Sequence, residues 1–177
     1  RVKIEESYTR AAIGGVGRAK AAGNYGASLY PAKQCQLEGF HQLVWTDAIE
    51  HKYIEESGTM NLMFVIDDVL ITPPLGDTIL AGITRMSVIE LLRHKGYQVV
   101  ERPISIDEVR EASKEGTLEE AFGTGTAVGI AMIQDIGYKD KDIHVSDESP
   151  VGQMVLDTIN GVRSGNLKDE LNWMCRI

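Results

Sequence analysis

The sequence predicts a single mixed α/β domain. Segments with the alternation typical of strands and segments with helical spacing follow one another along all 177 residues. No internal repeat, low-complexity tract or linker rich in Pro and Ser divides them. With 43% hydrophobic and 25% charged residues, the chain has the composition of a globular protein that buries a substantial core without disulfide or metal support.

The first half of the chain predicts one helix followed by strands. The residues after Arg1 are charged and β-like, and a helix begins near Asn24 and includes Tyr30 to Glu38. Asp67-Asp68 is predicted to form a hairpin turn, and Pro73-Pro74 ends that hairpin. The β-rich runs are Gln42 to Trp45, Lys52 to Glu56, Asn61 to Ile66 and Val69 to Thr72.

The second half predicts three helices between further strands. Thr84 to His94 has apolar residues at helical spacing and ends at Lys95-Gly96, so it predicts an amphipathic helix. Ser105 is placed to cap a second helix, which carries acidic residues in its first turn. Pro150 to Arg163 is the third helix, and no element is expected after Gly165. The strands of this half are Gln98 to Arg102, a strand starting at Glu120 to Gly123, and Val128 to Ile133.

Charge and residue patterns argue against several classes of function. The 18 basic and 26 acidic residues give a net charge of -8 without a basic stripe, which disfavours a nucleic acid partner. The apolar run Leu62 to Ile66 stops at Asp67, and no stretch reaches the roughly 18 apolar residues of a membrane span. Cys35 and Cys175 form no CxxC pair, which favours the cytoplasm. The histidines lack metal-binding spacing and no GxSxG motif occurs, so we expect neither a metal site nor an acyl-transfer triad.

The first candidate segment is GGVGRAKAAGNYG, from Gly14 to Gly26. Its glycines let the backbone approach a bound group closely, and its alanines leave the amine of Lys20 uncovered. A lysine placed in this way can be desolvated and form a Schiff base. The alternative is a surface turn with a solvated lysine. Spacing alone favours that alternative, because the segment fits neither the P-loop nor the dinucleotide-binding pattern.

Three further segments are candidates for ligand contacts. Glu55 to Asn61 brings carboxylates to the entry of a strand, where one could pair with a cationic ring nitrogen, although without a partner motif solvated acids in a hairpin are the better explanation. Gly82 to Arg85 opens a helix, and Gly123 to Ala127 is a Gly/Thr turn. Both offer backbone amides to an anion. Each of these two patterns is weak by itself, because Thr is a common helix cap.

Taken in order, the motifs GGVGRAKAAGNYG, ESGTMN, LAGITR and FGTGTA resemble the large domain of a branched-chain amino acid aminotransferase. That family has fold type IV among the pyridoxal phosphate enzymes. The resemblance runs from about Arg10 to the C-terminus. It implies a mixed sheet or pseudo-barrel with flanking helices, and pyridoxal 5'-phosphate as the cofactor. The implied reaction is transamination of Leu, Ile and Val with 2-oxoglutarate, giving branched-chain 2-oxo acids and glutamate.

The resemblance also implies roles for residues near the ring of the cofactor. Lys20 corresponds to the lysine that binds pyridoxal phosphate covalently and moves the substrate proton. Glu56 would face the pyridine nitrogen and keep it protonated. Tyr25 would bond the 3' oxygen, and Leu80 would pack on the ring face. Thr59 would contact the substrate less directly.

Anion-binding roles follow from the same resemblance. The amides of Ile83 and Thr84, with the hydroxyl of Thr126, would hold the phosphate. The amides of Thr126 and Ala127 would bind the substrate α-carboxylate. Some family members carry a CxxC pair after this turn, but Val128 and Ala131 stand there in this chain.

The family's chain is about twice as long, so residues 1–177 would be its C-terminal large domain without the small N-terminal domain. The small domain normally supplies an arginine to the phosphate and walls to the substrate pocket, so we expect this part alone to be inactive. A homodimer is expected of the parent protein. The alternatives are a D-amino acid aminotransferase or aminodeoxychorismate lyase of the same fold, or a non-catalytic isolated domain.

Overall fold

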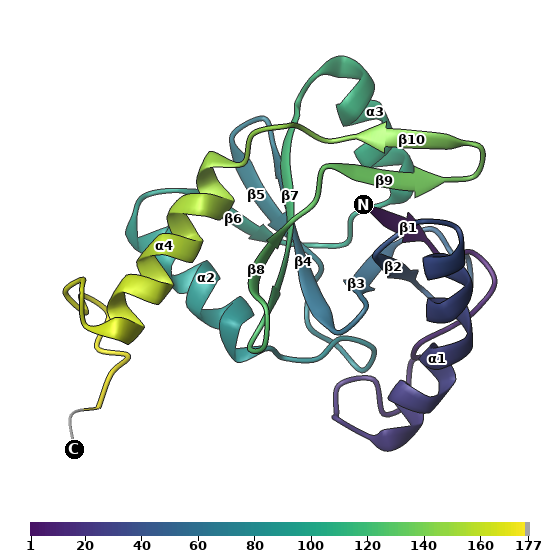
Figure 1. Cartoon of the computed structure of the whole chain (residues 1–177), viewed down its shortest axis with the longest axis horizontal. Helices are drawn as coiled ribbons and strands as arrows, with labels where there is room; N and C mark the ends of the chain where they lie inside the picture. Colours follow the sequence, from purple (N-terminus) through teal and green to yellow (C-terminus); the bar gives the residue numbers. More distant parts are fainter. Residues whose placement is uncertain (176–177) are drawn as a thin grey trace.

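A computed structural model describes residues 1–175, and within them ten strands form one curled mixed sheet with four flanking helices (Figure 1). The predicted mixed α/β class is confirmed. The strands are β1 (Val2–Ile4), β2 (Gln42–Thr46), β3 (Ile54–Ser57), β4 (Met60–Ile66), β5 (Val69–Thr72), β6 (Gln98–Glu101), β7 (Leu118–Gly125), β8 (Gly129–Met132), β9 (Asp135–Tyr138) and β10 (Lys141–His144). The helices are α1 (Ala22–Leu37), α2 (Ile83–His94), α3 (Ile106–Glu115) and α4 (Pro150–Ser164).

The sheet branches at β4. Its main path runs β10-β9-β1-β2-β3-β4-β5-β6, and β7 pairs with the other edge of β4 and with β8. The β1–β2, β1–β9 and β5–β6 pairs are parallel, and the remaining pairs are antiparallel. Because β3 and β5 share one edge of β4 while β7 occupies the opposite edge, the start of β4 lies between β3 and β7.

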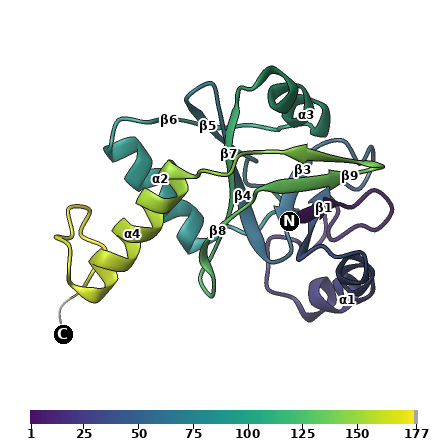
Figure 2. The same cartoon turned by 45° about the horizontal axis from the view of Figure 1, so that its top comes forward.

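Alternation along β4 builds the two main cores. Leu62 and Phe64 face a core that also contains residues of α3, and Met63 and Val65 face a second core with α2 and α4. Side chains of a strand point to opposite faces in turn, which explains why this strand reads as a continuous apolar run. Figure 2 shows α2 and α4 next to each other, with α1 and α3 toward the opposite end of the molecule. A third cluster packs Trp45 under α1.

Several helices begin and end at the local sequence signals expected for helix termini. The Ser105 side chain accepts a hydrogen bond from the Glu108 amide at the start of α3, and Gly116 ends that helix with φ 75°. Pro150 lies in the first turn of α4, where its missing N–H costs nothing. In the described part of the chain, no helix is long and apolar enough to cross a membrane.

Four strands differ from the sequence-based expectation: β3, β9, β10 and β7, which begins at Leu118 instead of Glu120. β3 begins at Ile54 instead of Lys52, because the Asp47 carboxylate binds the amides of Lys52 and Tyr53 in the preceding loop. The β9–β10 hairpin was not predicted. Its strands bury few side chains, with Ile136 and Ile143 entering the core, so their apolar alternation is weak.

Candidate active site

All nine predicted site residues line one cavity of about 790 Å³. They come from the loop before α1, from α1, from β3 and the β3–β4 turn, from the segment that leads into α2 and the first turn of α2, and from the β7–β8 turn. A cavity of this size suits a cofactor together with a small substrate. The predicted residues that line it are Lys20, Tyr25, Glu56, Thr59, Leu80, Ile83, Thr84, Thr126 and Ala127.

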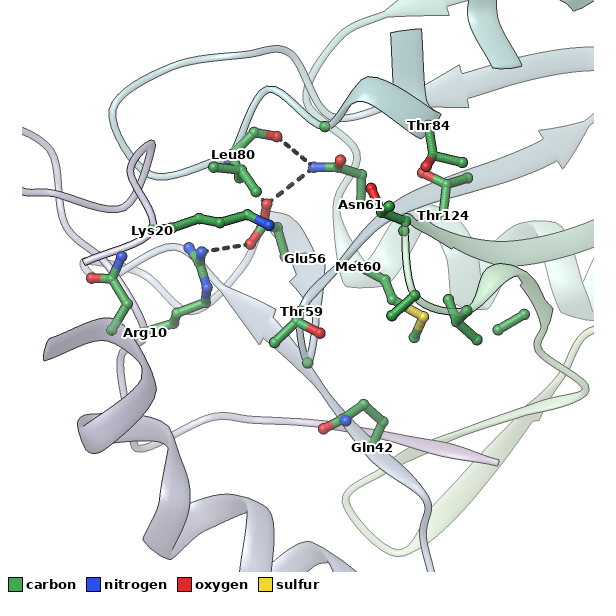
Figure 3. A pocket seen from close by; sticks show the side chains of 18 of the residues that line it. Arg10, Lys20, Gln42, Glu56, Thr59, Met60, Asn61, Leu80, Thr84 and Thr124 are labelled. Atoms are coloured by element: carbon green, nitrogen blue, oxygen red, sulfur yellow. Dashed lines mark hydrogen bonds and ion pairs between the residues drawn. The ribbon is translucent and has the colours of Figure 1, made fainter. Parts of the chain in front are cut away.

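The loop that carries Lys20 is stabilised by hydrogen bonds from the start of α1 and by one hydrogen bond to a neighbouring loop. The Asn24 side-chain amide donates to the carbonyl oxygens of Val16 (3.0 Å) and Ala19 (2.9 Å). The Arg18 amide donates to the Asp77 carbonyl, 2.9 Å away. Lys20 is exposed, and its side chain extends toward Glu56 (Figure 3). The amine is therefore accessible from a loop whose backbone is fixed.

Gly17 allows the loop that carries Lys20, here called the lysine loop (residues 14–21), to contact the loop before α2. A Cβ atom on Gly17 would lie 2.7 Å from the Thr78 Cα and 2.5 Å from the Ala11 Cβ, closer than real Cβ contacts permit. This close approach requires glycine at the position. The glycine-rich pattern of the sequence thus has a packing reason besides its place near the lysine.

Glu56 is almost fully buried beside the cavity, with 2% of its surface exposed. Its Oε1 accepts hydrogen bonds from Asn61 Nδ2 (3.0 Å) and the Leu80 amide (2.9 Å), while Oε2 pairs with Arg10 Nη2 at 2.9 Å. Burial raises the pKa of Glu56 to about 7, although the Arg10 charge and the Leu80 amide favour the carboxylate. This carboxyl group can therefore hold or release a proton near neutral pH.

Sequence reasoning assigned no role to several other residues that line the cavity, and the polar ones important for the site are Arg10, Asn61 and Thr124. Asn61 Nδ2 bridges Glu56 and the Leu80 carbonyl oxygen, 2.8 Å away (Figure 3). Asn61 belongs to the ESGTMN motif, and its place opposite Glu56 could have been anticipated from a β3–β4 hairpin. Thr124 lies within the FGTGTA motif, but no role was assigned to it, and for Arg10 the sequence carried no signal because its partners lie far away along the chain.

The N-terminus of α2 opens toward the same cavity. Gly82 is the N-cap residue, and across residues 1–175 no side chain forms a capping hydrogen bond with this helix and its first turn has no acidic residue. The first N–H groups of a helix lack partners inside the helix, so those of Ile83 and Thr84 are available to an anion. A Cβ atom on Gly82 would lie 2.2 Å from Asn61 Oδ1, which explains the glycine.

The β7–β8 turn forms the wall beside α2. Thr126 and Ala127 are exposed in this turn and line the cavity, as does Val128. Tyr25 projects from α1 and Thr59 from the β3–β4 turn into the same space. The cavity therefore combines an accessible amine, a buried carboxyl group and donors for anions. Among the described residues, no group of three or more His, Cys, Asp or Glu side chains could hold a metal ion.

Comparison with known proteins gives the family. The model of the family described as amino-transferase class IV matches residues 7–136. Branched-chain-amino-acid aminotransferase 2 of Bacillus subtilis (strain 168) is 44% identical over 100% of this chain and 49% of its own length. A probable branched-chain-amino-acid aminotransferase of Staphylococcus epidermidis is 41% identical over 100% of this chain and 50% of its own length.

The fold gives the same relationship. The solved structure of the branched-chain amino acid aminotransferase from Escherichia coli has a TM-score of 0.83 and 29% identity, covering 99% of this chain and 56% of that chain. The chain spans about half the length of the curated relatives it matches. With the family match extending over most of its residues, this chain belongs to the class IV aminotransferases.

Proposed function

We propose that this chain is the C-terminal, cofactor-binding large domain of a branched-chain amino acid aminotransferase. The whole protein would transfer the amino group of Leu, Ile or Val to 2-oxoglutarate, giving branched-chain 2-oxo acids and glutamate. The observation that carries the proposal is the meeting of Lys20, Glu56 and the uncapped N-terminus of α2 in one cavity. The names of the relatives support the class of substrate.

The cavity has the donor set that pyridoxal 5'-phosphate needs. The α2 N-terminus and the Thr126 hydroxyl suit a phosphate dianion, Leu80 offers an apolar surface to a ring, and Tyr25 offers a hydroxyl to the 3' oxygen. Glu56 offers a carboxyl group to the ring nitrogen. When bound, this cofactor supplies an aldehyde that reacts with amines and a ring that withdraws electrons from the substrate Cα.

The chain's own groups would then handle protons and orientation. Lys20 would hold the cofactor covalently and afterwards take and return the proton at the substrate Cα. Glu56, whose pKa is raised to about 7 by burial, would keep a proton on the ring nitrogen. As a carboxylate it would accept a hydrogen bond from the protonated ring nitrogen, and the charge of Arg10 favours that carboxylate.

Substrate binding would depend on the turn and on the rest of the protein. The amides of Thr126 and Ala127 would bind the α-carboxylate, with Thr59 nearby. The half of the protein outside this chain would supply a further phosphate ligand and most of the pocket walls. We propose a cytoplasmic homodimer for the whole protein, in line with the expectation from the family.

The test uses the full-length protein. Pyridoxal 5'-phosphate should produce a visible absorbance that added L-leucine bleaches, and leucine with 2-oxoglutarate should yield glutamate. Lys20→Ala should remove the absorbance and lower turnover by several orders of magnitude, because covalent and proton-transfer roles are lost together. Lys33→Ala, an exposed lysine of α1, is the matched control. Turnover of D-amino acids instead, or near-normal turnover by Lys20→Ala, would contradict the proposal.

A further inference from the structure

Three threonines of the sheet are almost completely buried, and one of them differs from the others. Thr46, Thr72 and Thr124 are each 1% exposed or less. The Thr46 hydroxyl donates to the Glu5 carbonyl at 2.8 Å, and the Thr72 hydroxyl donates to the Leu62 carbonyl at 2.7 Å. The Thr124 hydroxyl has no hydrogen-bond partner anywhere in residues 1–175.

An unpartnered buried hydroxyl is uncommon in a folded protein. Removing it from water costs free energy that a hydrogen bond normally returns. Such groups occur where a ligand completes the bonding. Valine has nearly the same shape as threonine and avoids this cost, so stability alone would favour valine at position 124. Thr46 and Thr72 show that buried threonines elsewhere in this sheet do have partners.

The strand register places Thr124 in the row of polar side chains beside the cavity. Asn61 pairs directly with Glu56 on β3 and with Thr124 on β7, and directly opposed residues point to the same face. The row Glu56–Asn61–Thr124 therefore crosses three strands. Glu56 and Asn61 bond to each other and to the segment before α2, whereas the row ends at the hydroxyl of Thr124.

The end of this row coincides with the anion-binding end of the cavity. Thr124 lines the cavity together with Ile83, Thr84 and Thr126. Figure 3 shows Thr84 and Thr124 at the same end, away from Lys20 and Arg10. The α2 N-terminus has a positive end dipole and no side-chain cap in the described residues. A hydroxyl group whose proton can rotate is a suitable donor to a dianion at this place, in addition to the backbone amides of α2 and the Thr126 hydroxyl.

We propose that the Thr124 hydroxyl donates a hydrogen bond to the phosphate group of pyridoxal 5'-phosphate, as a binding residue in addition to Ile83, Thr84 and Thr126. The inference rests on the proposed function, because it takes the cofactor from there. In the cofactor-free protein, the unpartnered hydroxyl lowers the stability of the folded state. In the cofactor-bound protein, its hydrogen bond to the phosphate would increase the affinity for the cofactor.

The test compares Thr124→Val, Thr124→Ser and Thr72→Val in the full-length protein. Thr124→Val should weaken binding of pyridoxal 5'-phosphate by roughly 10- to 100-fold, the effect of one bond to a charged group, and leave binding of pyridoxal unchanged. Thr124→Ser should retain most of the affinity. The midpoint of thermal unfolding of the cofactor-free Thr124→Val protein should stay the same or rise.

Thr72→Val is the matched control with the opposite signature. It removes a hydroxyl that is bonded inside the protein, so it should lower the unfolding midpoint and leave cofactor affinity unchanged. Inorganic phosphate gives a second measurement: it should raise the unfolding midpoint of the unsubstituted cofactor-free protein more than that of Thr124→Val, because bound ligand stabilises the folded state.

Each contrary result shows whether the proposed function or only the inference about Thr124 is wrong. An unsubstituted protein that binds no pyridoxal 5'-phosphate would contradict the proposed function itself. Normal affinity in Thr124→Val would overturn only the inference. Equal losses for pyridoxal 5'-phosphate and pyridoxal would place the hydroxyl at the ring and not at the phosphate. A cofactor-free Thr124→Val protein that is destabilised or fails to fold would show that the hydroxyl is bonded within the fold, which also overturns the inference.

Discussion

Arg10 joins three segments of the cavity wall through one side chain. Its guanidinium group donates to the carbonyl oxygens of Thr78 (2.7 Å) and Gly17 (3.3 Å) and pairs with Glu56 at 2.9 Å. The lysine loop, the loop before α2 and β3 are thus fixed relative to one another. Arginine suits this role because its planar fork holds several acceptors at set angles, which lysine does not match.

The first prediction concerns this charge. Arg10→Met in the full-length protein should still capture the cofactor but lower turnover by roughly tenfold or more, because Glu56 would lose the charge that keeps it ionised. The acid limb of the pH profile of kcat should move to higher pH, since the pKa of Glu56 rises without Arg10. Arg18→Met, a mostly exposed arginine of the same loop, is the control. A pH profile that does not move would contradict this role.

The second prediction is the pH dependence of stability at Glu56. Burial raises the pKa of this group from its ordinary 4.5 to about 7, so the folded state binds the proton more tightly than the unfolded state. Its contribution to stability is therefore complete below pH 4.5 and is lost as the pH rises through about 7.

Glu56→Gln should consequently make the fall in the free energy of unfolding between about pH 5 and about pH 8 smaller. The measurement is denaturant unfolding of the full-length, cofactor-free protein at several pH values. The comparison uses slopes, because the substitution can also change stability by an amount that does not depend on pH. Parallel curves for the two proteins would show that Glu56 does not titrate in this range.

At the scale of elements, Asp47 organises the loop between β2 and β3. Its two carboxylate oxygens accept hydrogen bonds from the amides of Ile49, Glu50, Lys52 and Tyr53. Burial alone would raise the pKa of Asp47, but these four amides outweigh it and lower the pKa to about 2. The ionised group contributes stability above its ordinary value of 3.8, and that contribution is lost as the pH falls through about 2.

The third prediction is that Asp47→Asn lowers the free energy of unfolding by about 1 to 2 kcal/mol near neutral pH, with the difference shrinking toward about pH 2. The direction is opposite to that expected of Glu56. Glu50→Gln, an exposed side chain of the same loop, is the matched control. A loss for Asp47→Asn that is equally large in acid would indicate that geometry, and not charge, stabilises the loop.

The fourth prediction concerns Glu120, which caps α4 from the neighbouring strand. It is 2% exposed, and its oxygens accept from the amides of Val151 (2.7 Å) and Gly152 (2.8 Å). Glu120→Ala should lower the free energy of unfolding by about 2 to 3 kcal/mol, because two helix amides lose a charged acceptor. Denaturant unfolding measures this effect. Glu119→Ala, exposed on the other face of β7, is the control, and equal losses would contradict the capping role.

At the scale of the whole molecule, the surface of α1 and of the loop before it is unusually apolar. Of the sixteen residues of α1, the buried ones are Asn24, Pro31 and Cys35. Large exposed apolar side chains in this region are Ile13, Val16, Tyr25, Leu29, Tyr30 and Leu37. Exposed apolar patches of this kind usually meet another surface. The chain covers about half of its relatives' length, so further protein surface is expected around it.

The fifth prediction follows for residues 1–177 in isolation. They should capture pyridoxal 5'-phosphate but not turn over leucine and 2-oxoglutarate, because proton transfer at Cα depends on walls that position the substrate and exclude water. They should also self-associate in light scattering. The assay monitors glutamate, with the full-length protein as the control. Parent-like turnover from a sample free of the other half by mass would contradict this division of roles.

The sequence by itself determined the fold class, most of the elements and nine of the residues that line the cavity. Through the family resemblance that they carry, the four ordered motifs identified nine residues that all line one cavity. Each motif is also a local feature: a glycine loop, a hairpin, a helix start or a turn. Caps such as Ser105 were also predicted from residues a few positions apart. Local signals of this kind depend on short stretches of backbone, which the order of residues specifies directly.

Only the tertiary structure decided which distant residues complete the site. Thr124 meets Asn61 through the register of β4 and β7, and Arg10, from the loop between β1 and α1, meets Glu56 on β3. The raised pKa of Glu56 likewise depends on everything packed around it. The β9–β10 hairpin also depends on the tertiary structure. Its apolar pattern is weak, and the pairing of β9 with β1 stabilises it. Burial and register are properties of the assembled chain, so no short segment carries them.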